Sequence, residues 1–164
     1  ADGASSWINQ GSATLSGIEA EVSYDLGVPL DLAWEVRPYL NLTLLTEYED
    51  NATDEDLLYI SPTNYSAGLA VSDGARWTGR LNVAYTGSQS VQDWASLVYP
   101  VPVVTLDSFV VADLTASYRF LESDRYGKWS LRGEVRNLLD EDYGYVLNNP
   151  MPGRSVFAGL RWEF

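Results

Sequence analysis

Five aromatic side chains stand in stretches that the sequence marks as loops, and aromatic rings in loops can stack on a planar ligand. They are Tyr59, Trp94, Tyr99, Tyr143 and Tyr145. The same residue types also pack loops against one another and gather at membrane interfaces. This set therefore predicts either a ligand-contact surface or structural packing, and the sequence leaves both open. Neither interpretation requires a cofactor.

A second candidate is a row of charges, Arg132, Glu134 and Arg136, spaced two residues apart. In a β-strand this spacing places all three side chains on one face. Such a row can contact a permeating anion, or its members can pair with charges across neighbouring strands. Either role requires the row to face water, because an Arg or Lys facing mid-bilayer lipid costs about 2–4 kcal/mol.

The sequence offers little that an enzyme could use. It has no cysteine and no histidine, which removes thiolate chemistry and the commonest general base and metal ligand. Acidic runs at 54–56 and 140–142 contain cation-ligand types, but charge runs are usually solvated loops. The net charge of −13 makes nucleic acid a poor partner. We therefore predict a protein that is not an enzyme and holds no metal.

These residues are positioned by segments with a period of two. At the end of the chain, Val156, Ala158, Leu160, Trp162 and Phe164 alternate with mostly polar or small residues. Such alternation predicts a β-strand with one apolar and one polar face. Six earlier segments alternate in the same way: 9–26, 33–48, 58–72, 76–87, 109–120 and 129–139. No helical period is present, so we predict an all-β antiparallel meander of seven strands.

The predicted connections alternate between short and long. The short turns are 27–32, 73–75 and 121–128, and the longer loops are 49–57, 88–107 and 140–152. Short turns on one rim and long loops on the other are typical of outer-membrane barrels. No apolar run reaches the length of a transmembrane helix, which barrel strands do not need. Pro38 falls on the apolar parity of a predicted strand, where it would cost a ladder hydrogen bond unless a β-bulge absorbs it.

Eight aromatic residues of apolar parity lie within a few positions of a short turn or of the carboxy terminus. They are Tyr24, Trp34, Trp77, Tyr118, Phe120, Trp129, Trp162 and Phe164. An interfacial aromatic girdle is expected to produce this pattern in a sequence. The alternative is a soluble β-sandwich binding module whose core aromatics gather near one end. The charge parity favours the membrane interpretation.

Four stretches carry a family resemblance: 16–20 (SGIEA), 85–89 (YTGSQ), 135–143 (VRNLLDEDY), and 150–154 (PMPGR) followed by a strand that ends in Phe164. Together they resemble the carboxy-terminal part of TonB-dependent outer-membrane transporters. The third is similar to the family's NLFDKDY segment, with Leu139 where Phe is usual. The pairing of the third and fourth stretches at this spacing is the more specific part of the resemblance.

The resemblance implies that residues 1–164 form the last seven strands of a 22-stranded transmembrane β-barrel. The upstream strands and a plug domain would then lie outside these residues, because seven strands leave two open edges that lipid cannot satisfy. It also implies active uptake of a scarce nutrient through the bacterial outer membrane, an iron–siderophore complex first, with haem or cobalamin as alternatives. The TonB complex would act through the plug, which the charged row at 132–136 could contact.

The carboxy-terminal strand also resembles the signal read by the barrel-assembly machinery, through Gly159, Trp162 and Phe164. Phe157 stands where the signal has a polar residue. A simpler role for Phe164 is anchoring at the membrane interface, and both roles are compatible. The remaining partners implied are outer-membrane lipid, lipopolysaccharide and a small-molecule ligand. A passive porin-type channel shares the barrel and is the nearest functional alternative.

Overall fold

The computed structural model describes residues 11–164, and every regular element in that range is a β-strand. No helix capable of crossing a membrane is found among these residues. The strands are β1 (Ala13–Ser23), β2 (Glu35–Asp50), β3 (Glu55–Asp56), β4 (Thr63–Ser72), β5 (Trp77–Thr86), β6 (Gln89–Gln92), β7 (Val103–Leu106), β8 (Phe109–Ser123), β9 (Gly127–Arg136) and β10 (Ser155–Glu163).

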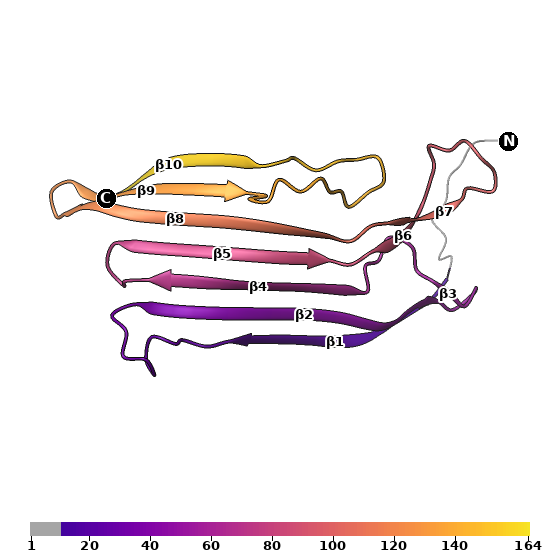
Figure 1. Ribbon diagram of the computed structural model, residues 1–164, viewed down its shortest axis with the longest axis horizontal. Coiled ribbons are helices and arrows are strands. Elements are labelled where there is room, and N and C mark those ends of the chain that lie inside the picture. Colours follow the sequence, from indigo (N-terminus) through magenta and orange to yellow (C-terminus); the bar gives the residue numbers. More distant parts are fainter. Residues whose placement is uncertain (1–10) are drawn as a thin grey trace, which may run out of the picture.

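One antiparallel sheet holds eight of these strands, and its main path runs β1-β2-β4-β5-β8-β9-β10 (Figure 1). The seven strands on this path correspond to the seven predicted segments in the predicted order, which confirms the meander. Short β3 pairs with the end of β2, and β6 and β7 form a separate hairpin. The sequence analysis placed these three in loops, because two to four residues are too few to show alternation.

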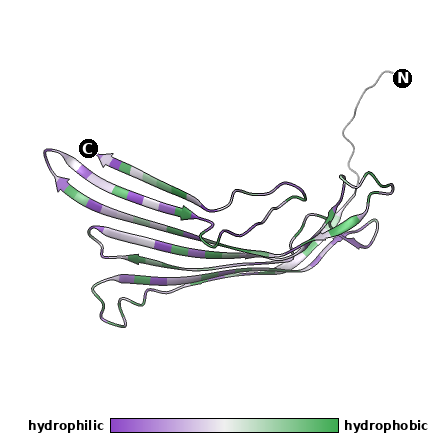
Figure 2. Cartoon of the chain, turned by 45° about the horizontal axis from the view of Figure 1, so that its top comes forward, coloured by the Kyte–Doolittle hydropathy of each residue, from purple (hydrophilic) through white to green (hydrophobic). Residues whose placement is uncertain are grey.

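The strand register aligns apolar residues in rows across the sheet. One row runs through Leu69, Leu81, Leu114, Val135 and Val156. Most of this row is exposed, and no second layer covers it within residues 11–164 (Figure 2). The soluble sandwich alternative is therefore wrong for this range, because its aromatic residues do not meet inside a two-layer core. We call this side of the sheet the apolar face.

The opposite side, which we call the polar face, carries the residues of the other parity. A row one position away from the leucine row contains Arg37, Ala70, Arg80, Thr115 and Glu134. Because alternate side chains of a strand point to opposite faces, the two rows cannot mix without a bulge. The partition predicted from parity is therefore maintained along these two rows.

The connections also separate as predicted, with short turns on one rim and long loops on the other (Figure 1). The carboxy terminus lies on the short-turn rim. One short turn is closed by Asp73, whose Oδ1 accepts hydrogen bonds from the backbone N–H groups of residues 75–77 at 2.7–2.9 Å. In this turn Gly74 has a φ of 69°, which glycine adopts without strain.

Two irregularities differ from the expectation. Pro38 stays in unbroken register with Leu69, so no bulge in the β2–β4 pair absorbs its missing N–H. The proline nitrogen faces the side of β1, where the Tyr24 N–H already bonds to the Pro38 carbonyl just beyond the end of that strand, and the β2–β4 ladder loses nothing. A bulge occurs instead in β8, where the register passes over Phe120 and places Leu121 opposite Trp129.

A candidate ligand groove at the long-loop rim

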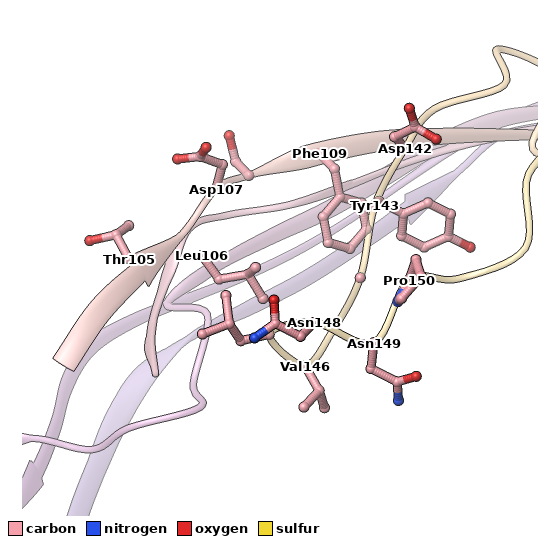
Figure 3. Close-up of a pocket in the computed structure, with 13 residues that line it drawn as sticks. Thr105, Leu106, Asp107, Phe109, Asp142, Tyr143, Val146, Asn148, Asn149 and Pro150 are labelled. Carbon is pink, nitrogen blue, oxygen red and sulfur yellow. The ribbon is translucent and has the colours of Figure 1, made fainter. Parts of the chain in front are cut away.

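A groove of about 490 Å³ opens at the long-loop rim. Residues 105–109, which lead into β8, form one side, and residues 142–150 of the β9–β10 loop form the other (Figure 3). The two sides are far apart in sequence and meet because β8 and β9 are neighbours in the sheet. The volume falls within the range of small-molecule sites in proteins.

Two aromatic residues, Phe109 and Tyr143, line the groove, and the ring of Tyr145 packs against both. Phe109 is only 7% exposed, with the Tyr143 ring centroid at 4.7 Å and the Tyr145 centroid at 5.2 Å. The two tyrosine rings meet edge to face at 5.9 Å. Phe109 pairs with Thr86 and so belongs to the polar-face parity. The β9–β10 loop therefore folds over the polar face rather than the apolar one.

Asn137 holds the beginning of the β9–β10 loop in place. Its side chain is 2% exposed, and its backbone has a φ of 50°. The Asn137 N–H donates to Asp113 Oδ1 at 2.9 Å, and its amide group exchanges two hydrogen bonds with the backbone of Glu141, at 2.8 and 2.9 Å. Asparagine tolerates the left-handed region and bonds its neighbouring backbone, which explains a turn at this point.

The acidic run at 140–142 has a structural role at its first member. Asp140 has a φ of 59°, and its Oδ1 accepts the N–H of Arg154 at 2.7 Å. That contact ties the two ends of the β9–β10 loop together. Among the described residues, no group of His, Cys, Asp or Glu is arranged to hold a metal ion.

The groove carries no basic side chain among its lining residues, whereas Asp107 and Asp142 both line it. Figure 3 shows the rings of Phe109 and Tyr143 side by side, with the two carboxylates directed away from them. Burial raises the pKa of the Tyr143 hydroxyl, with the neighbouring Tyr145 and Asp113 adding to the effect. Tyr143 is therefore a neutral phenol at physiological pH. The arrangement favours planar, neutral or cationic groups over anions.

The five loop aromatics that the sequence singled out do not form one site. Tyr143 and Tyr145 belong to the groove cluster described above. Tyr59 instead packs on β6, where its hydroxyl accepts the Gln92 N–H at 3.3 Å. Trp94 and Tyr99 lie between β6 and β7 and are 67% and 93% exposed. Their roles as ligand contacts stay predictions.

Sequence reasoning missed Phe109 as a member of the groove. It is an aromatic residue at the loop end of a strand, on the parity that continues through Val111 to the polar residues Asp113, Thr115 and Ser117. A large apolar side chain on the polar face is expected to be buried by another part of the chain. The position of Phe109 was therefore the one feature of the sequence that could have indicated the groove. The cover itself could not be predicted, because it comes from a loop about thirty residues later.

The predicted charged row is present on the polar face of β9. Glu134 pairs with Arg132 at 3.1 Å and with Arg136 at 2.6 Å. Pairing therefore runs along one strand, and the expectation of pairing across strands is wrong. The Arg136 guanidinium also lies 5.2 Å from the ring centroid of Phe157 on β10, a distance suited to a cation–π contact.

The three residues of the predicted assembly signal lie in or directly after β10. Gly159 pairs with Arg132, and a side chain added at this glycine would meet open space. Trp162 stacks on Trp129 at 5.7 Å and contacts the ring of Phe164 at 5.8 Å. All three residues thus belong to the edge strand of the described sheet or directly follow it, and their recognition by an assembly factor stays a prediction.

Comparison with known families decides the wider assignment. A model described as "TonB dependent receptor-like, beta-barrel" matches residues 1–138. The chain belongs to this family. The assignment confirms the resemblance drawn from the motifs, and the all-β antiparallel fold agrees with it. No curated protein matches the chain.

Membership in the TonB-dependent receptor barrel family places the chain among outer-membrane receptors and transporters rather than enzymes. The matched range contains the SGIEA and YTGSQ stretches and the beginning of VRNLLDEDY. It ends before residues 142–150 of the β9–β10 loop, so the family match does not cover this side of the groove. The total of 22 strands in a complete receptor barrel stays a prediction.

Proposed function

We propose that this chain is the carboxy-terminal part of a bacterial outer-membrane receptor that imports a scarce nutrient with energy from the TonB complex. The observation that carries the proposal is the location of the groove: it lies on the polar face, at the long-loop rim, while apolar rows cover the opposite face. A transporter needs its ligand site on the water-filled side of the wall, at the entrance.

This assignment orients the sheet in the membrane. The apolar face contacts lipid, and the long-loop rim faces outward, in contact with lipopolysaccharide. The short-turn rim faces the periplasm, where aromatic pairs such as Trp77–Tyr118, with centroids 4.2 Å apart, lie at the membrane interface. The polar face then lines the lumen and contacts the plug. The barrel-assembly machinery reads Gly159, Trp162 and Phe164.

An iron–siderophore complex is the first choice of ligand within this proposal, with haem and cobalamin as alternatives. Planar aromatic groups of such a ligand can stack on the rings around Phe109 and Tyr143. The absence of basic side chains among the groove's lining residues disfavours ligands recognised through exposed anionic groups. Specificity is completed by loops and plug residues outside the described range.

The test is energy-dependent uptake by the full-length receptor. A strain that lacks the receptor is complemented with it, in the presence and absence of a functional TonB complex, and supplied with radiolabelled ferric siderophores. We expect ligand to bind the cell surface in both backgrounds and to accumulate only with TonB. Accumulation that is equal without TonB, together with open-channel conductance in planar bilayers, would instead identify a passive channel.

A further inference from the structure

A second cavity lies at the short-turn rim, far from the ligand groove, with a volume of about 220 Å³. It is bounded by the turn between β4 and β5 and by the polar face of β8 and β9. Its hydrogen-bonding side chains are Ser72, Arg76, Thr78, Ser117, Arg119 and Ser130. The register aligns Ser72, Thr78 and Ser117 in one row of the polar face. We call this cavity the arginine pocket.

Arg119 has an unsatisfied donor in this pocket. Its Nη1 pairs with Glu122 at 3.1 Å, and its backbone N–H bonds to the Arg76 carbonyl at 2.8 Å. Its Nε is buried and finds no hydrogen-bond acceptor among residues 11–164. A buried donor on a charged group is costly when it is unpaired, so this geometry calls for an acceptor oxygen.

The charges around the arginine pocket favour an anion. Two arginines line it and no carboxylate does, in a chain with a net charge of −13. The nearby carboxylates are already engaged: Asp73 accepts the backbone N–H groups of residues 75–77, and Glu122 is shared between Arg119 and Lys128. Guanidinium groups and hydroxyls together are the usual protein ligands of carboxylate and phosphate oxygens.

We propose that the arginine pocket binds an oxyanion, a carboxylate or a phosphate group, through Arg119 Nε and the surrounding hydroxyls. The oxyanion is either carried by a small solute in the lumen or supplied by an Asp or Glu of another segment of the full-length chain. The inference goes beyond nutrient import and is independent of which nutrient the receptor takes. It requires only that the polar face encloses the interior of the complete barrel.

The first arm of the test uses inorganic phosphate and the full-length receptor in detergent, with binding followed by broadening of the ³¹P resonance. Arg119→Met is expected to weaken binding at least about tenfold, as loss of a charge-assisted contact does. The matched control is Arg125→Met, because Arg125 lies at the same rim but over the ring of Tyr126, outside the pocket. Phosphate binding that is unchanged in Arg119→Met would overturn the proposal.

The second arm decides the case in which the wild-type receptor binds no phosphate. The Arg119→Lys receptor is treated with a carbodiimide, which joins an amine to a carboxylate in direct contact, and the products are mapped by mass spectrometry. A bond to an Asp or Glu other than Glu122 identifies the internal source. A bond to Glu122 alone, combined with no phosphate binding, would overturn the proposal. Folding of each variant is checked by its heat-dependent migration in gels.

Discussion

Trp162 of β10 stacks on Trp129 of β9, with ring centroids 5.7 Å apart and an interplanar angle of 23°. Both indole N–H groups donate to the same acceptor, the Tyr126 carbonyl, each at 3.0 Å. Within residues 11–164, β10 pairs with β9 alone. One edge of β10 is therefore unpaired in this range. The indole of Trp162 joins the end of β10 to the β8–β9 turn through the Tyr126 carbonyl, which the indole of Trp129 also contacts.

Replacing this indole pair should loosen the end of β10. We expect Trp162→Leu to reduce the free energy of unfolding of the full-length receptor by about 1–3 kcal/mol, from a lost aromatic contact and a lost hydrogen bond. Trp129→Leu and the double variant complete a thermodynamic cycle, measured by urea titration in detergent. A coupling energy near zero would show that the two rings act independently.

Gly127 and Gly74 provide a matched pair for testing a close approach. Both have a φ near 70°, at 71° and 69°, so alanine pays the same backbone penalty of about 1–2 kcal/mol at each. A side chain at Gly127 would also collide with the Glu163 carbonyl, whereas at Gly74 nothing lies within 4 Å. Gly127→Ala should therefore lower the thermal midpoint of the receptor more than Gly74→Ala does. Equal shifts would remove the close contact from the explanation.

Asp73 should give the short turn a dependence on acid. Backbone hydrogen bonds, first that from Trp77, hold the pKa of Asp73 below its ordinary value of 3.8. A lowered folded-state pKa contributes stability that is complete above the unfolded-state pKa and is lost as the pH falls through the folded value. Asp73→Asn should thus lower the thermal midpoint at pH 7, and the difference should shrink as the pH falls below 3.8 and vanish only below the lowered folded-state pKa. Asp124→Asn, in another short turn, is the control; a difference that persists in acid contradicts this account.

Phe109 should matter more for ligand binding than the most exposed loop aromatics. The ring of Phe109 packs against the rings of both Tyr143 and Tyr145. Phe109→Ala should therefore disorder the groove and weaken ligand affinity about tenfold or more. Trp94→Ala removes a ring that is 67% exposed and lies outside the groove, and should change affinity less than threefold. Equilibrium binding of ferric siderophores to whole cells compares the two, and the reverse order would relocate the site to the β6–β7 hairpin.

Alternation was sufficient to predict the seven main strands and their two faces, because a strand's side chains point alternately to its two sides. The gaps between the predicted strands were also sufficient to predict that short turns and long loops follow one another in turn. Alternation failed where pairing rather than pattern decides: Pro38 is accommodated because β1 ends opposite it, and the bulge in β8 moves Leu121 to the place opposite Trp129. The residues around Pro38 do not reveal where the neighbouring strand β1 ends.

The sequence by itself determined the family, the meander and the division into an apolar and a polar face. All three depend on local spacing and short motifs. Only the tertiary structure decided which residues meet: Phe109 under Tyr143, Arg119 beside the hydroxyls of neighbouring strands, and the charged row paired along β9 rather than across the sheet. These contacts depend on how neighbouring strands are aligned and on the path that each loop takes. A period of two tells which face a side chain occupies, but it does not tell which residues lie beside it.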